Sequence, residues 1–143
     1  IRSQVIGFIF QSFNLLPVLN VYENVEIPLL LKKNFLSKQE REKIILPILE
    51  RIGLKEYIKH KPEELSGGQR QRTAIARSLV GGPDLVLADE PTANLDSKTG
   101  QEIISLMSDL NNDSKTTFVI SSHDPMIINF AQKVVRIKDG EIM

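Results

Sequence analysis

The sequence predicts an α/β fold organised around a parallel β-sheet. Short apolar runs of strand length alternate with longer segments whose apolar residues recur at helical spacing. One run, Leu85–Ala88, is apolar at every position, as is typical of a parallel strand buried on both faces. In the second half of the chain, the order strand, helix, strand, helix, strand implies right-handed crossovers between parallel strands.

The composition is that of one globular domain. The chain has 143 residues, 41% of them hydrophobic and 25% charged, and this length can bury a substantial core. The formal net charge is zero, which disfavours nucleic acid as the main partner. The absence of cysteine excludes disulfides and thiolate metal sites and is compatible with a reducing compartment. The apolar runs are too short to span a bilayer.

Val5–Phe10 is predicted to be the first strand, because it is a short run of β-branched and aromatic residues. Gln11 follows it directly. A polar residue just past the carboxyl end of a buried strand is a common ligand contact in α/β folds, although a solvated loop residue is the simpler interpretation. After a loop, Val21–Ile27 is predicted to form a short helix that Pro28 interrupts, with a second piece beyond it.

A longer helix is predicted over Lys38–Ile52. Ser37 and Glu40 form a capping box at its start, and Gly53 suits the position after its last turn. Pro47 lies inside this helix and should remove a backbone hydrogen bond and kink it. The apolar face of the helix consists of Ile44, Ile45, Ile48, Leu49 and Ile52.

The basic segment Lys55–Lys61 is expected to be a solvated surface, with His60 as an exposed histidine. The whole region from Val21 to Leu65 therefore contains predicted helices and no predicted strand. We expect it to form a helical subdomain inserted in the α/β core.

Leu65–Gln69 reads Leu-Ser-Gly-Gly-Gln and opens the next predicted helix. Ser66 is a candidate N-cap, and Gln69 completes a capping box with it. Gly67 and Gly68 let the backbone approach a ligand, and the free N–H groups and positive dipole end of a helix attract an anion such as phosphate. A well-capped surface helix, with glycines that serve only as a turn, is an equally good interpretation of these residues.

After a turn, the predicted strand Leu85–Ala88 ends in two carboxylates, Asp89 and Glu90. A helix capped by Asp96 or Ser97 follows and is predicted to run to about residue 110. Its apolar face consists of Ile103, Ile104, Leu106, Met107 and Leu110.

Thr116–Ser121 is the next predicted strand, and His123 stands just beyond it. Asp124–Pro125 supplies an N-cap and a first-turn proline for a short helix that is expected to reach about residue 132. Val134–Ile137 is predicted to be the following strand of the sheet, and Asp139–Gly140 to be a hairpin turn into a return strand.

Polar groups thus stand just past three predicted strands: Gln11, the pair Asp89 and Glu90, and His123. In an open parallel sheet these strand ends face one crevice. The first carboxylate can hold Mg²⁺, and the second can orient or deprotonate a water that attacks a phosphate. Each group alone could be a solvated strand end or a structural histidine. Together with the anion site at the Leu-Ser-Gly-Gly-Gln helix, they favour phosphoryl chemistry.

These residues, in this order and spacing, resemble the nucleotide-binding ATPase domain of ATP-binding-cassette (ABC) transporters. Leu65–Gln69 matches the ABC signature at every position. The other matches are Gln11 to the Q-loop glutamine, Leu85–Asp89 to the Walker B strand, Glu90 to the catalytic glutamate, Asn94–Asp96 to the D-loop and His123 to the switch histidine.

Three further segments, Phe13–Pro17, Glu23–Val25 and Ala88–Asp96, are similar to one branch of this family. The branch contains lipoprotein-releasing, macrolide- or peptide-exporting and antimicrobial-peptide-resistance ATPases. The resemblance implies a P-loop NTPase-like sheet core, incomplete here, with an inserted helical subdomain. Its expected parts are a core strand with the Q-loop (1–20), the helical subdomain with the signature helix (21–80) and an α/β core with Walker B, D-loop and switch histidine (81–143).

The resemblance also implies a role for each matched residue. Glu90 would polarise the attacking water, His123 would contact the γ-phosphate of ATP, and Gln11 would sense the metal and the water. Asp89 would hold Mg²⁺ together with Gln11. A second ATPase domain would join in a head-to-tail dimer, and its nucleotide would meet Ser66, Gly67, Gly68, Gln69 and Asp96.

Transmembrane permease subunits are the other implied partners, with no nucleic acid. The helical region and the Q-loop would dock on them, which implies a cytoplasmic protein that is peripheral on the inner face of the cell membrane.

The chain departs from the family pattern in one respect. The phosphate-binding sequence Gly-x-x-x-x-Gly-Lys-Ser/Thr (Walker A) does not occur, and the aromatic residue that stacks on adenine is absent too. Both should lie before Ile1, so we expect a fragment that binds ATP poorly and hydrolyses it negligibly, cut from a complete ATPase. The alternatives are a non-catalytic dimerisation or membrane-subunit docking module, and a soluble ABC protein that acts on ribosomes or DNA.

Overall fold

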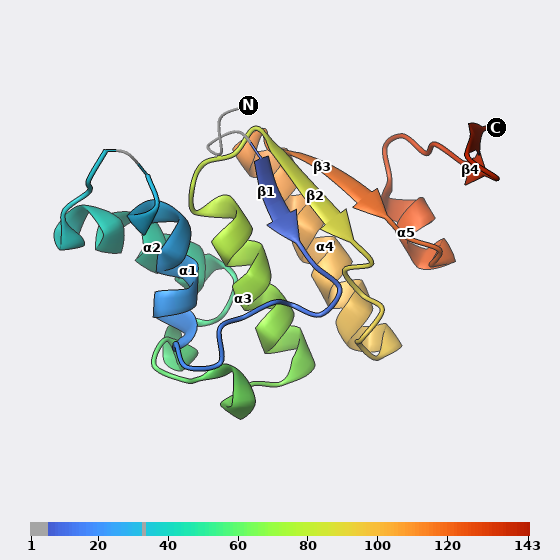
Figure 1. Cartoon of the computed structure of the whole chain (residues 1–143). Coiled ribbons are helices and arrows are strands. Elements are labelled where there is room, and N and C mark those ends of the chain that lie inside the picture. Colours follow the sequence, from blue (N-terminus) through green and yellow to red (C-terminus); the bar gives the residue numbers. More distant parts are fainter. Residues whose placement is uncertain (1–5, 33) are drawn as a thin grey trace.

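The computed structural model describes residues 6–32 and 34–143 and shows an α/β fold centred on a three-stranded parallel sheet (Figure 1). The strands are β1 (Ile6–Ile9), β2 (Leu85–Asp89) and β3 (Thr117–Ser121), in the order β1-β2-β3. The predicted parallel sheet with helices is confirmed. Val5, the predicted start of the first strand, lies outside the described residues.

The two faces of this sheet differ in burial. Phe8 pairs with Leu87, and Leu87 pairs with Val119, so these three residues form a row across one face. Phe8 is 48% exposed and Val119 is 53% exposed, whereas Ile9 and Ala88 on the opposite face are buried. We call the first face the open face of the sheet.

Two long helices cover the buried face. α3 (Gly67–Leu79) lies beside β1, and α4 (Ser97–Ser114) lies behind the sheet in Figure 1. The close approach of α3 to β1 requires Gly7, because a Cβ atom there would lie 2.4 Å from the carbonyl oxygen of Ser78. The sheet therefore fixes the position of α3 through backbone contact.

The predicted helix starts are confirmed. Ser37 and Ser66 each form the expected capping box with the residue three positions later. Asp96, rather than Ser97, caps α4. The end of α4 was less predictable, because the helix continues past residue 110 to Ser114 before the chain turns away.

α1 (Val21–Leu30) is one continuous helix, so the predicted break at Pro28 is wrong. Pro28 cannot donate a backbone hydrogen bond, but the next turn still forms, and the N–H of Leu31 reaches the carbonyl of Ile27 at 3.2 Å. Leu29 in that turn is buried in the core, and this burial compensates for the missing bond.

α2 (Lys38–Arg51) has the predicted start and face, with Ile45 and Leu49 fully buried. Gly53 follows it with a φ of 74°, as expected for a residue that ends a helix. Two short 3₁₀ helices, η1 (Lys55–Tyr57) and η2 (Pro62–Glu64), then lead to α3.

His60, predicted to be an exposed histidine, is half-buried instead. Its ring packs edge-on against Tyr57, with the ring centroids 5.3 Å apart. The backbone of His60 is also fixed, because the carbonyl of His60 accepts a hydrogen bond from the N–H of Val21 at the start of α1.

The C-terminal segment departs from the prediction. α5 (Pro125–Phe130) starts as expected but ends before residue 132. β4 (Ile137–Lys138) and β5 (Glu141–Ile142) form an antiparallel hairpin around the predicted turn, but the hairpin is separate from the parallel sheet. No residue from 131 to 143 is buried, so apolar packing does not draw Val134 and its neighbours into the sheet.

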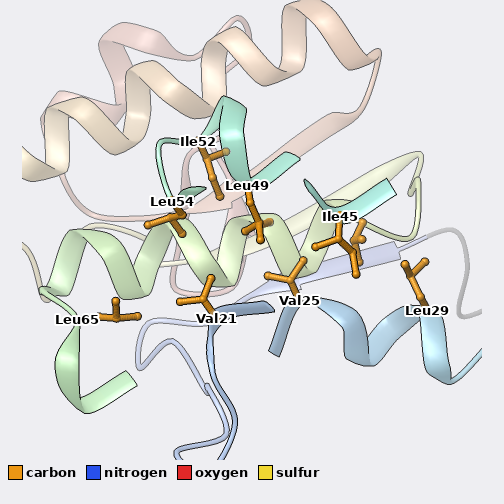
Figure 2. Packing of buried hydrophobic residues seen from close by; sticks show 10 residues of the cluster. Val21, Val25, Leu29, Ile45, Leu49, Ile52, Leu54 and Leu65 are labelled. Carbon is orange, nitrogen blue, oxygen red and sulfur yellow. The ribbon is translucent and has the colours of Figure 1, made fainter. Parts of the chain in front are cut away.

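Buried hydrophobic residues form two cores. The helical core, seen in Figure 2, lies between α1, α2 and α3 and contains Val21, Val25, Leu29, Ile45, Leu49, Ile52, Leu54, Leu65, Ala76 and Val80. The sheet core lies between the sheet, α3, α4 and α5 and contains Ile9, Ile75, Val86, Ala88, Ile103, Ile104, Met107, Leu110 and Ile127. In the described parts of the chain, no helix has both the length and the apolar character that a bilayer crossing needs.

Candidate functional site

The residues predicted at the strand ends lie at one edge of the sheet. β1, β2 and β3 are parallel and paired in register, so the residues that follow them emerge together. Gln11 follows β1, Asp89 and Glu90 stand at the end of β2, and His123 follows β3. The structure brings Glu90 and His123 into direct contact. Gln11 is linked to this region through its backbone carbonyl, which accepts the side-chain amide of Asn94 at 2.8 Å.

Glu90 is fixed by the segment that follows β3. Its carboxylate accepts hydrogen bonds from Ser122 Oγ at 2.8 Å and from the backbone N–H of His123 at 3.2 Å. His123 Nδ1 lies 2.6 Å from the same carboxylate. Glu90 also has a φ of 44°, in the left-handed region that residues other than glycine rarely adopt. Strained residues held in this way cluster at functional sites.

The contact changes the pKa of both side chains. Desolvation alone would raise the pKa of Glu90, but the hydrogen bonds from His123 and Ser122 outweigh it and lower the pKa below its ordinary value of 4.5. The hydrogen bond to Glu90, followed by the charge of Glu90, raises the pKa of His123 above its ordinary value of 6.5. Glu90 is therefore ionised at neutral pH and can accept a proton or orient a water.

The signature residues form the N-terminus of α3. The side chain of Ser66 accepts the backbone N–H of Gln69 at 3.3 Å, and the side chain of Gln69 accepts the backbone N–H of Ser66 at 2.9 Å. The capped helix is therefore present. Capping leaves the N–H groups of Gly67 and Gly68 in the first turn, where helices bind anions. The two interpretations of this motif are compatible with each other.

The glycines of the signature also let α3 pack closely against the start of α4. A Cβ atom on Gly68 would lie 2.6 Å from Thr99 Cγ2, and one on Gly67 would lie 3.1 Å from Leu95 Cδ2. Asp96 is the N-cap of α4 and lies in the sequence between Leu95 and Thr99, the two residues that pack against the signature glycines. Hydrogen bonds from the side chain and the backbone N–H of Thr99 lower the pKa of Asp96. The signature and the D-loop segment are thus in mutual contact within one chain.

Two residues with no role in the sequence analysis fix the loop that carries Gln11. Asn24 is fully buried, and its side chain bonds the N–H of Leu16 and the carbonyls of Leu16, Leu19 and Asn20. Arg77 of α3 donates to carbonyls of the same loop. A signal for Asn24 was present in the sequence, because an asparagine between Val21 and Val25 falls on the apolar face of α1.

The donors at the strand ends fit a magnesium ion that is shared with a phosphate. Asp89 is an exposed carboxylate at the end of β2, and Gln11 is an exposed amide residue two positions past the end of β1. Mg²⁺ typically takes one or two carboxylates and completes its shell with waters and phosphate oxygens. Across residues 6–32 and 34–143, no group of three or more His, Cys, Asp or Glu side chains could hold a metal ion.

Comparison with known proteins identifies the family of the chain. The family model described as ABC transporter matches residues 1–93. The ABC transporter ATP-binding protein MJ0796 of Methanocaldococcus jannaschii is 47% identical over 144 residues, which cover 99% of this chain and 61% of that protein. The lipoprotein-releasing system ATP-binding protein LolD of Francisella tularensis is 47% identical over 141 residues, with 99% and 61% covered.

Two further matches extend the comparison. The macrolide export ATP-binding/permease protein MacB of Syntrophobacter fumaroxidans is 44% identical over 142 residues, which cover 99% of this chain and 20% of that protein. A solved structure, described as a dimeric post-hydrolysis state of the ATP-binding cassette MJ0796 bound to ADP and Pi, superposes with a TM-score of 0.82 at 45% identity. That superposition covers 96% of this chain and 60% of the other.

The fold is therefore that of an ATP-binding cassette. The chain belongs to the ABC transporter family, and its similarity to the lipoprotein-release and macrolide-export branch is confirmed. It spans 61% of the length of relatives such as MJ0796 and LolD.

Proposed function

We propose that this chain is part of the ATP-binding subunit of an ABC-type export or lipoprotein-release transporter, and that the complete protein hydrolyses ATP. The main support is the strained, ionised Glu90 in contact with His123 beside Asp89. Hydrolysis of a phosphoanhydride needs a group that orients water, a donor to the phosphate and a metal ligand. These three side chains meet those needs at one edge of the sheet.

Each residue then has a chemical role. Glu90 orients the attacking water and accepts its proton, and Asp89 with Gln11 would hold Mg²⁺. Mg²⁺, when bound, neutralises charge on the phosphates. The side chain of His123 is 87% exposed, so it can turn from Glu90 towards a γ-phosphate without disturbing the core.

The signature completes a second nucleotide site in this proposal. Ser66–Gln69 and Asp96 would meet a nucleotide held mainly by another copy in a head-to-tail dimer. The first-turn N–H groups of α3 support this role, as does the description of the MJ0796 structure as a dimer bound to ADP and Pi.

Permease subunits are the proposed membrane partners, and the proposed location is the cytoplasmic face of the membrane. Support comes from the relatives: the name of MacB joins an ATP-binding and a permease part, and LolD is named as part of a lipoprotein-releasing system. The helical region around α1 and α2, with the Q-loop, is the proposed docking surface.

These 143 residues alone are expected to bind MgATP weakly, because no Walker A sequence occurs among them. Calorimetric titration should therefore detect MgATP binding to the complete protein and little binding to the 143-residue chain. Micromolar affinity of the 143-residue chain would contradict this expectation. A complete protein that binds ATP but never hydrolyses it would support the non-catalytic module instead.

The dimer can be tested by light scattering of the complete Glu90→Gln protein with MgATP. Ser66→Arg in that background should abolish the ATP-dependent dimer, because the larger side chain blocks the end of α3. Ser105→Arg, at an exposed position in the middle of α4, is the matched control and should leave the dimer intact. A dimer that persists in the Ser66→Arg variant would refute the proposed arrangement.

A further inference from the structure

The loop between β1 and α1, which carries Gln11, forms hydrogen bonds with side chains from three other segments of the chain. Asn94, in the turn after β2, donates to the carbonyl of Gln11 at 2.8 Å. Asn24 of α1 bonds the far end of the loop, including the N–H of Leu16 at 2.8 Å. Arg77 of α3 bonds the middle of the loop. Asn24 lies only eight residues from Leu16 in the sequence, whereas Asn94 and Arg77 both reach the loop from distant segments. Of the three residues, Arg77 is the one that belongs to α3.

Arg77 contacts the loop through two parallel donors. One terminal nitrogen, Nη1, donates to the carbonyl of Asn14 at 2.6 Å, and the other, Nη2, donates to the carbonyl of Phe13 at 2.8 Å. Such a fork is specific to the planar guanidinium, because a lysine ammonium is a single point charge. Arg77 is partly buried at this contact, and this burial lowers the pKa of its guanidinium.

The backbone at this contact is strained. Phe13 has a φ of 64° and Asn14 has a φ of 47°, and both lie in the left-handed region. For a bulky residue such as phenylalanine, this conformation persists only where surrounding contacts impose it. Arg77 binds the carbonyls of these two residues and therefore stabilises the turn that follows Gln11.

α3 links this contact to the signature. Gly67 begins α3, and Arg77 lies about ten residues later on the same rigid helix, roughly 15 Å along its axis. A displacement of the signature end of α3 would therefore be passed to the loop through Arg77. Without Arg77, the loop would lose these two hydrogen bonds to α3 and keep those to Asn24 and Asn94.

We propose that Arg77 is a positioning residue whose guanidinium fixes the loop of Gln11 to α3, so that Gln11 and the signature keep one relative position. Arg77 touches neither the nucleotide nor the water and acts through Gln11. The catalytic consequence rests on the proposed ATPase function, whereas the structural consequence does not.

The test uses the complete protein with Arg77→Lys, which keeps the charge and removes the fork. The kcat for ATP hydrolysis should fall at least about 10-fold while the KM for ATP changes less than about 2-fold, because misplacement of a positioning group affects the reacting geometry. Arg72→Lys is the matched control. Arg72 lies on the same helix and donates to the carbonyl of Ile52 at 3.0 Å, away from the loop, so its kcat should stay within about 2-fold of wild type.

Two readouts separate positioning from general destabilisation. In a Gln11→Ala background, Arg77→Lys should cause little further loss of kcat, because the two residues act in one unit. Hydrogen exchange of the amides at residues 12–16 should accelerate in Arg77→Lys and not in Arg72→Lys, whether or not the protein hydrolyses ATP. A wild-type protein without hydrolysis would refute the proposed function. Unchanged hydrogen exchange at residues 12–16 in Arg77→Lys would refute the positioning of the loop by Arg77. Equal loss of kcat in both lysine variants, or additive loss with Gln11→Ala, would also overturn the inference.

Discussion

The helical core and the sheet core contain similar residues but differ in how completely they are enclosed. The helical core is enclosed by α1, α2 and α3, and Val25, Leu49 and Leu54 in it are fully buried (Figure 2). The sheet core is covered on one side, while Phe8 and Val119 on the open face remain half exposed in the described structure. Apolar burial is the main driving force of folding, so the helical core should contribute more stability per residue than the sheet.

α3 is the element that the two cores share. Ala76 and Val80 belong to the helical core, whereas Ile75 belongs to the sheet core. The same helix begins with the signature and carries Arg77. The signature therefore lies on a helix, α3, that both cores hold in place. This explains how the signature can be positioned although one face of the sheet is open.

The largest expected effect on stability is in the helical core. Leu49→Ala should lower the free energy of unfolding of this chain by about 2–5 kcal/mol, because Leu49 is fully buried and its loss leaves a cavity. Leu46→Ala is the control on the same helix, where the side chain is 43% exposed, and it should cost less than about 1 kcal/mol. Urea denaturation measures both values. Equal losses would show that the helical core is not tightly packed.

A smaller loss of stability is expected from a substitution where α3 packs against the start of α4. Gly68→Ala should cost about 1–3 kcal/mol, because the new methyl group would lie 2.6 Å from Thr99 Cγ2. Adding Thr99→Ser removes that methyl group and should restore most of the stability. Gly81→Ala, where a Cβ atom meets nothing within 4 Å, is the control and should be close to neutral. If Thr99→Ser gave no recovery in thermal denaturation, the close packing of the signature would be wrong.

Substitutions on the open face of the sheet should change the free energy of unfolding least. Val119→Ser should change the free energy of unfolding by less than about 1 kcal/mol, because the side chain is already 53% exposed. The same substitution should raise the solubility of the 143-residue chain, since it interrupts an exposed apolar row. A loss as large as that of Leu49→Ala would mean that the open face is covered in solution, for example by a second copy.

The contact of Glu90 and His123 should make stability depend on pH within a defined window. The pKa of Glu90 is lowered, so its contribution is present above about pH 4.5 and is lost as the pH falls through the folded-state pKa. The pKa of His123 is raised, so its contribution is present below about pH 6.5 and is lost as the pH rises through the folded-state pKa. NMR titration of His123 should show a pKa above 6.5 that falls in Glu90→Gln. An unchanged pKa in Glu90→Gln would refute the contact.

Much of the fold could be predicted from local patterns. Ser37, Ser66 and Asp96 mark helix starts because capping uses side chains within three residues, and the strand Leu85–Ala88 is evident from its continuous apolar run. The break at Pro28 and the placement of Val134–Ile137 in the parallel sheet were wrong predictions, because long-range burial decides both. The hairpin turn at Asp139–Gly140 was predicted correctly. Burial of Leu29 keeps α1 intact, whereas residues 131–143 are all exposed in the part of the chain that the structure describes.

The site was predictable to a similar degree. That Gln11, Asp89, Glu90 and His123 lie at one edge of the sheet could be predicted, because the ends of parallel strands share an edge. The contact of Glu90 with Ser122 and the fork of Arg77 could not be found, because each joins residues far apart in sequence through the folded geometry. The positive φ of Glu90 could not be found either, because residues other than glycine rarely adopt it.

The central claim is that Glu90 activates the water that hydrolyses ATP in the complete protein. Phosphate release at saturating MgATP should fall at least about 100-fold in Glu90→Gln, because a positioned general base contributes about 10²–10⁴-fold to such a reaction. MgATP affinity should be retained, and Glu63→Gln at an exposed position far from the strand ends in sequence should hydrolyse ATP normally. Near-normal phosphate release by Glu90→Gln would contradict the claim.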